Sequence, residues 1–239
     1  SISSTGAVVS GITSFTGGTV NLPFSFSFYG QSTMSIGVSP YGYLYLSGDD
    51  VTSSNIGIPH SDSSTFFYPQ TFMAPWWDGY GSIGTAPSTI RFQVRGAAPQ
   101  REAVIEWASM LPTGSSTRIS FQASLFEGTN AIRFSYGTTA PQVSSASVSI
   151  QRAINEGVSG LSCTTTVAGN CGALNWPAGQ ALEFFLPPDL SLGVISGDQA
   201  AYAGVNYRAT AVVRNQGGHK ATNVGVRFYL SSNPTLEVS

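Results

Sequence analysis

Four groups of side chains have types and spacings that could support chemistry. Carboxylates could bind a calcium ion, aromatic rings could stack on a sugar, and two nearby cysteines could form a disulfide. Glutamates could supply the acid and base of a glycoside hydrolase. The residues are Asp49, Asp50 and Asp78; Trp76, Trp77, Tyr41 and Tyr43; Cys163 and Cys171; and Glu102, Glu106 and Glu127.

The aspartates are weak calcium candidates. Calcium takes about six to eight oxygen ligands, and the acidic residues here lack the spacing of an EF-hand. Capping of turns by Asp49, Asp50 and Asp78 is the favoured interpretation. No other cofactor is expected, since the sequence has no phosphate-binding glycine loop and no nucleophile elbow.

The adjacent Trp76 and Trp77, together with Tyr41 and Tyr43, could form a platform for a carbohydrate. Their apolar neighbours favour a core position instead, because tryptophan is mostly buried. We expect a strand that begins at Pro75 and ends at the following Asp-Gly turn. At least one of the two tryptophans should then be buried, and its replacement by alanine should cost roughly 3–5 kcal/mol.

Cys163 and Cys171 lie close together in a Thr- and Gly-containing stretch. A zinc site would want four ligands, and the two histidines are far away in sequence, so a short disulfide loop is favoured over free thiols or a metal. Disulfides persist in oxidising compartments. The chain also opens at Ser1 without a methionine or a signal sequence, which favours a mature secreted product.

The composition excludes several classes of protein. Charged residues make up 9% of the chain and the formal net charge is −2, with the cations scattered singly. A nucleic-acid-binding protein would show a basic face, so no nucleic-acid partner is expected. No run of about 20 apolar residues is present that could span a membrane.

Apolar residues alternate with polar ones through most of the chain, which predicts β-strands and no helix. Phe24, Phe26 and Phe28 alternate with serines, and Tyr41–Leu46 has two apolar faces, as expected of a central strand. Further strands are expected at Val148–Ile150 and Leu182–Leu186. The fold class is therefore all-β, an antiparallel sandwich.

Two hairpins have registers that can be worked out from the sequence. The first pairs apolar residues on one face and oppositely charged residues on the other, which is expected to be exposed; a slip by one residue would reverse both faces. These ion pairs argue against an enzymatic role for the glutamates. The expected partners are Ile90 with Trp107, Phe92 with Ile105, Val94 with Ala103, Arg91 with Glu106 and Arg95 with Glu102; and, in the second hairpin, Leu125 with Ile132, Ala123 with Phe134 and Phe121 with Tyr136.

The chain divides at Pro187-Pro188, a stiff spacer. Residues 1–186 form the predicted sandwich domain. Residues 189–239 show three further alternating segments, the last containing Val224, Val226, Phe228 and Leu230. Three strands are half of an immunoglobulin-like sandwich, so the second domain is expected to be partial.

Two resemblances to known families add to this interpretation. The segments Leu22–Gly30, Val38–Leu44 and Ala74–Asp78 resemble a β-sandwich module of secreted and surface-anchored bacterial proteins, distantly similar to nidogen-type extracellular domains. Residues 189–239 are similar to the first half of the bacterial cell-adhesion-related domain CARDB, through Val213–Gly217 and Val226–Ser231. Both resemblances imply an extracellular adhesive or structural role, and neither implies a catalytic residue.

The sequence therefore predicts a non-enzymatic extracellular module, for example a subunit of a surface fibre or matrix. Its partners would be other copies of the chain, other surface components or a carbohydrate. The partial second domain implies either that the natural protein continues past Ser239, which is favoured, or that a neighbouring copy supplies strands. A carbohydrate-binding domain and an accessory domain of a larger secreted enzyme remain as alternatives.

Overall fold

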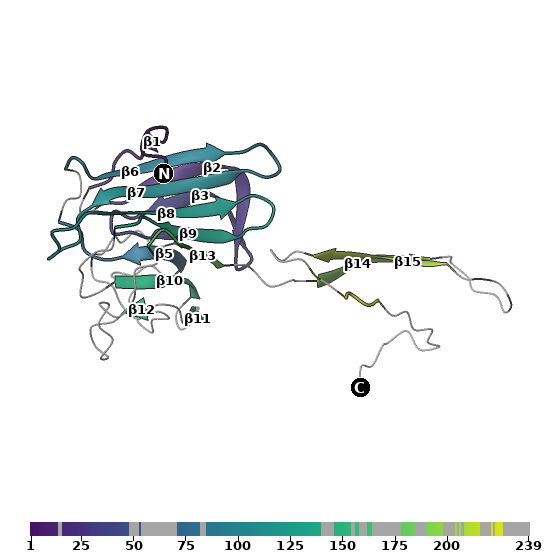
Figure 1. Ribbon diagram of the computed structural model, residues 1–239. Coiled ribbons are helices and arrows are strands. Elements are labelled where there is room, and N and C mark those ends of the chain that lie inside the picture. The colour runs from purple at the N-terminus through teal and green to yellow at the C-terminus, as the bar shows by residue number, and fades with distance from the viewer. Residues whose placement is uncertain are drawn as a thin grey trace. The chain divides into compact units, whose positions relative to one another are not determined.

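The computed structural model contains two compact units, Ser1–Leu186 and Pro187–Ser239. Among the residues that it describes, all regular secondary structure is β-strand (Figure 1). No helix that could cross a membrane occurs in this part of the chain. The structure describes all residues except 14–15, 48–52, 54–70, 82–84, 140–145, 154–155, 158–161, 164–177, 185–189, 198–203, 205, 207, 216–220, 222 and 227–239.

Unit 1 consists of two antiparallel sheets. The first sheet has the order β1-β6-β7-β8-β9-β13, with β1 at Ala7–Val8, β6 at Thr89–Arg95, β7 at Glu102–Met110, β8 at Ile119–Phe126, β9 at Ile132–Tyr136 and β13 at Ala181–Phe184. The second has the order β11-β10-β5-β4-β3-β2, with β2 at Gly18–Phe28, β3 at Gln31–Val38, β4 at Leu44–Ser47, β5 at Thr71–Trp77, β10 at Ala146–Ala153 and β11 at Glu156–Gly157; the short β12, Ser162–Cys163, also pairs with β10.

The two sheets lie face to face, with β2 and β3 behind β7 and β8 in Figure 1. Alternation places every second side chain of β2 in the space between them, including Phe24, Phe26 and Phe28. Trp107 and Phe121 of the first sheet stack in the same core at 5.2 Å between ring centroids. The predicted antiparallel sandwich is confirmed.

Both predicted hairpin registers are confirmed. In β6 and β7, Ile90 pairs with Trp107 and Arg91 pairs with Glu106. In β8 and β9, Phe121 pairs with Tyr136. The local alternation was sufficient to determine these pairings because one face of each hairpin contributes to the core.

Two predicted strand boundaries are wrong. Residues 41–43 form a turn and β4 begins only at Leu44, so the predicted central strand is shorter at its start. The strand that carries the tryptophans begins at Thr71, so Pro75 lies inside it. The tertiary contacts described below explain both differences.

Unit 2 contains a two-stranded antiparallel sheet of β14, Leu190–Gly197, and β15, Ala209–Asn215. Leu192 pairs with Val213, and Leu190 lies on the same face of β14. Of the predicted third strand, Val224 and Val226 are exposed and outside any strand, and Phe228 and Leu230 lie outside the described residues.

Candidate functional site

The tryptophan stretch contains a β-bulge in the central strand β5. Between Ala74 and Trp77, β5 has one residue more than β10 has between Ser149 and Ser147. Proline cannot donate a ladder hydrogen bond and is tolerated inside a sheet at such a bulge. This is why Pro75 lies within the strand.

The bulge turns two backbone carbonyls away from the sheet ladder, and two tyrosines bind them. The hydroxyl of Tyr136, on β9 of the opposite sheet, donates to the carbonyl of Pro75 at 2.8 Å. The hydroxyl of Tyr80 donates to the carbonyl of Trp76 at 2.8 Å. Burial raises the pKa of both phenols, so both remain neutral donors. The Tyr136 bond joins the two sheets, whereas the Tyr80 bond is local to the end of β5.

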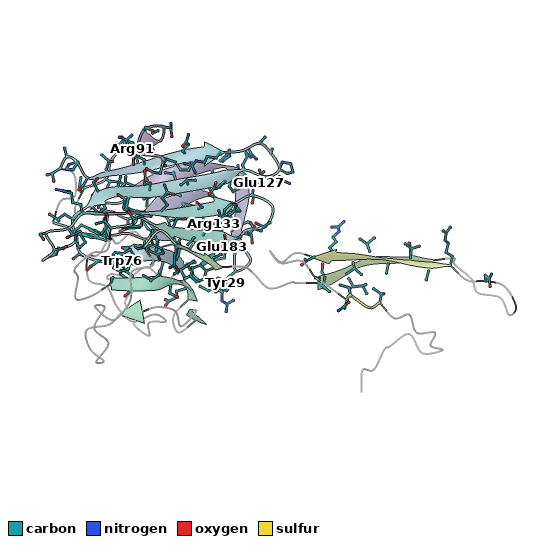
Figure 2. All side chains as sticks on the ribbon, viewed as in Figure 1. Tyr29, Trp76, Arg91, Glu127, Arg133 and Glu183 are labelled. Carbon is teal, nitrogen blue, oxygen red and sulfur yellow. The ribbon has the colours of Figure 1, made fainter. Side chains whose placement is uncertain are left out.

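Trp76 and Trp77 are both buried, with 2% and 0% of their surface exposed. Trp77 packs on Tyr43 at 4.8 Å and on Phe72 at 5.4 Å between ring centroids. The expectation that at least one tryptophan is a core residue is confirmed. Trp76 is labelled in Figure 2, within unit 1.

All four aromatic side chains of the predicted sugar platform are buried. Tyr43 is 0% exposed and Tyr41 8% exposed, so none of the four predicted rings offers a free face for stacking. Every residue from Thr71 to Trp77 is buried, so both faces of β5 are covered.

A turn at Ser39–Tyr43 holds the bulge in place. Gly42 has a φ of +84°, and an added Cβ would lie 2.0 Å from the carbonyl oxygen of Trp76. The Gly42 carbonyl accepts from the Trp76 N–H, and the Ser39 carbonyl accepts from the Nε1 of Trp107 at 2.8 Å. The turn therefore needs a glycine at 42, and it contacts both sheets.

Asp78 is the calcium candidate that the structure describes. It is buried, and its Oδ1 accepts from the N–H of Gly79 at 2.8 Å, as expected of a turn-capping aspartate. Asp49 and Asp50 lie outside the described residues, and no group of three or more metal-ligating side chains occurs within the described part. Cys163 is the last residue of β12, and Cys171 lies outside the described residues. The predicted disulfide therefore also lies outside the described part of the chain.

Glu106 lies on a face that was expected to be exposed, yet it is only 2% exposed. The N-terminal segment, residues 1–9, covers it. Glu106 Oε2 accepts from the N–H of Ile2 at 3.2 Å and from the hydroxyl of Ser3 at 2.9 Å. Oε1 accepts from Nε2 of Gln122 at 3.0 Å. A buried carboxylate is thus satisfied by neutral donors.

The two arginines on β6 bind the same segment instead of the glutamates. Arg91 Nη1 donates to the carbonyl of Gly6 at 2.8 Å, and Arg95 Nη2 donates to the carbonyl of Ser1 at 3.2 Å. The expected ion pairs to Glu106 and Glu102 do not form, although the register is correct. The ion pairs are absent because backbone carbonyls of the N-terminal segment accept hydrogen bonds from both arginines. Arg91 is labelled in Figure 2.

We call Arg91, Gln93, Arg95 and Glu106 the receptor face of the first sheet. Gln93 also takes part, since the Thr5 hydroxyl donates to its Oε1 at 2.9 Å. Ile2 is completely buried against this face, and β1 extends the sheet along β6. A cleft of about 290 Å³ opens beside Ser1, with Glu106, Gln122 and Ser135 among its lining residues.

The sequence analysis did not predict that the N-terminal segment covers the outward face of β7, although one residue of that strand indicated a covering layer. Val104 lies between Glu102 and Glu106 on the outward face of β7 and is completely buried. An apolar residue at an outward position indicates a covering layer. Nothing in the sequence shows that residues 1–9 form that layer.

Glu127 is the third glutamate of the sequence analysis and lies in the turn after β8. Its Oε1 pairs with Arg101 Nη2 at 2.6 Å, and its Oε2 accepts from Arg101 Nε at 2.7 Å. These side-chain hydrogen bonds are the main reason that the pKa of the Glu127 carboxyl lies below its ordinary value. Glu127 therefore ties two hairpin ends together; in Figure 2 it lies apart from the Arg133–Glu183 ion pair.

The fold defines an antiparallel β-sandwich of two sheets, followed in the chain by a two-stranded antiparallel sheet. The chain belongs to the family described as NIDO related, whose model matches residues 2–184. Residues 187–239 match the model of CARDB, so both expected resemblances are confirmed, in the expected order. No curated protein and no solved structure matches the chain.

These two families are non-catalytic domain types. CARDB indicates a cell-adhesion-related, immunoglobulin-like domain at a cell surface. The N-terminal segment falls within the matched residues from Ile2 onward, so it is part of the NIDO-related domain.

Proposed function

We propose that this chain is a non-enzymatic, extracellular adhesive module and a subunit of a surface fibre or matrix. The observation that carries the proposal is the tandem of a NIDO-related sandwich and a CARDB segment. The carboxylates of the sequence analysis support it, because Glu106 and Glu127 are each engaged in structural hydrogen bonds.

The sheet of unit 2 supports the adhesive part of the proposal. Leu190, Leu192 and Val213 share one face, and they are 45%, 56% and 36% exposed. A sheet with an apolar face is stable when a second layer covers that face. Such a surface is suited to association with another protein surface.

Bead aggregation tests the adhesive role. Microspheres coated with the full chain should aggregate, whereas beads coated with serum albumin should stay dispersed. Leu192→Asp should reduce aggregation, because it places a charge on the apolar face; Thr210→Asp, an exposed position on β15, is the matched control. Dispersed beads with the unaltered chain would contradict the role.

The carbohydrate alternative loses its main support with the burial of Trp76 and Trp77. Specific binding of the full chain to a glycan array would restore it. Turnover of glycoside substrates by the chain would contradict the non-enzymatic assignment.

A further inference from the structure

The N-terminal segment is held to the receptor face by hydrogen bonds to its backbone and by a few of its own side chains. Glu106 binds a backbone N–H and a hydroxyl, while two arginines bind backbone carbonyls. Ile2 supplies the buried side chain. At Gly6 an added Cβ would lie 2.9 Å from Cδ1 of Ile2 and 3.2 Å from Cβ of Arg91, so a larger residue would not fit without a shift.

The connection from this segment to the rest of the chain is short and crosses between the two sheets. Residues 10–17 link β1, at the edge of the first sheet, to β2, at the edge of the second. Ser10, Gly11, Thr13 and Thr16 are exposed. Gly11 has a φ of +79° with nothing within 4 Å of an added Cβ, whereas Val9 and Ile12 on either side of it pack against the core. Gly11 is therefore the position at which the chain could change direction between the exchanged segment and Ile12.

We propose that the receptor face binds the N-terminal segment of a second copy of this chain, so that copies are linked by exchange of residues 1–9. Exchange would keep the burial of Ile2 and every hydrogen bond of the segment, because donor and acceptor residues are the same in each copy. This inference rests on the proposed role as a subunit of an assembly, where copies are held at high local concentration.

The contacts also indicate which peptide sequence the receptor face can bind. It fits an extended peptide with the pattern Ser-Ile-Ser followed by a glycine at the sixth position. That pattern occurs once in the chain, at residues 1–6. A second copy is therefore a partner that carries the required sequence.

Disulfide trapping tests the exchange in the full chain. Ala7 of β1 is the direct partner of Phe92 of β6, and partners in an antiparallel pair lie at a separation that a disulfide can bridge. One variant carries Ala7→Cys and the other carries Phe92→Cys. The two are unfolded and refolded together, oxidised, and analysed by mass spectrometry under non-reducing conditions.

A covalent dimer in which the two introduced cysteines are linked to each other is expected, since neither variant can form this link within one chain. The control mixture pairs Ala7→Cys with Ser32→Cys, an exposed position on β3 of the other sheet. It reports random collision and any reaction of the native cysteines. A chain with both Ala7→Cys and Phe92→Cys shows that the geometry allows the link.

The proposal is overturned if the double variant closes its disulfide while the mixture yields no more dimer than the control. Failure of the double variant to close would also overturn it, because the β1–β6 register would then be wrong. Neither result affects bead aggregation, which probes Leu192 in unit 2, so the two proposals can fail separately.

Discussion

At the scale of single residues, Glu106 shows how a covered charge differs from an exposed one. The carboxylate is buried because the N-terminal segment lies over it and donates to it. Its energetic role therefore depends on contacts between residues about a hundred positions apart in sequence. A surface ion pair with Arg91, as the register alone suggested, would contribute little.

Glu106→Gln should destabilise unit 1 and loosen the N-terminal segment. The amide is uncharged and has one acceptor oxygen, so it cannot accept from Ile2, Ser3 and Gln122 together as the carboxylate does, and about 1.5–3 kcal/mol should be lost. Urea unfolding followed by tryptophan fluorescence measures the loss, since all four tryptophans precede residue 187. Hydrogen exchange of residues 2–9 should accelerate.

Glu102→Gln is the matched control for this substitution. Glu102 lies on the same strand and the same face as Glu106, but it is partly exposed. The structure describes all of residues 1–9, and Glu102 makes no hydrogen bond to them. A change within about 0.5 kcal/mol is expected for such a surface position. Equal losses for both variants would show that the segment is not held by Glu106.

The Arg101–Glu127 pair should make stability depend on acid pH. The pKa of Glu127 is lowered in the folded chain by its hydrogen bonds to Arg101, from an ordinary value of 4.5. Its contribution is therefore complete above about pH 4.5 and is lost as the pH falls through the lower folded-state pKa.

Urea midpoints of the unaltered chain and of Glu127→Gln, measured between neutral and acidic pH, check this expectation. The difference between them should be largest at neutral pH and should shrink below about pH 4.5, where the unaltered carboxyl becomes protonated too. A difference that stays constant or grows as the pH falls would contradict the assignment.

At the scale of elements, the bulge in β5 and the turn before β4 form one unit. The bulge accommodates Pro75, and its carbonyls are bound by Tyr136 and Tyr80. The turn lies against the bulge, where the Gly42 carbonyl accepts from the Trp76 N–H, and it contacts Trp107 through the Ser39 carbonyl. The alternation predicts a strand at residues 41–43. These residues form a turn instead, because the contacts with the bulge and with Trp107 require one.

Gly42→Ala should therefore be far more costly than Gly30→Ala. Both glycines have positive φ, +84° and +82°, so both variants have the backbone cost of about 1–2 kcal/mol for a left-handed residue. Only at Gly42 would the new Cβ also meet the Trp76 carbonyl oxygen, at 2.0 Å, while nothing lies near Gly30. Urea unfolding compares them, and equal losses would contradict the close approach.

At the scale of the whole molecule, the tandem of a NIDO-related and a CARDB domain agrees with an extracellular setting. We propose that Cys163 and Cys171 form a disulfide there. In the chain-entropy model a loop this short stabilises by about 2–3 kcal/mol.

Thiol labelling of the chain, produced in an oxidising compartment and purified without reductant, tests this disulfide. Under denaturing conditions without reductant, no cysteine should react with maleimide, and both cysteines of the chain should react after reduction. Reduction should also lower the urea midpoint followed by tryptophan fluorescence. Labelling of both cysteines before reduction would show that they are free thiols.

The all-β class and the two hairpin registers could be predicted from the amino-acid sequence. These follow from a period of two along each strand, which neighbouring residues establish without knowledge of distant ones. The alternation of Phe24, Phe26 and Phe28 and the pairing of Ile90 with Trp107 are of this kind.

The roles of Glu106, Pro75 and Gly42 could not be predicted from the sequence. Each role depends on a partner that no local pattern identifies: Ile2 for Glu106, Tyr136 for Pro75 and Trp76 for Gly42. Alternation shows which way a side chain points, but it does not show what covers that face. Burial of Glu106 is set by a segment that lies about a hundred positions away in the chain, and so it appears only when the chain is folded.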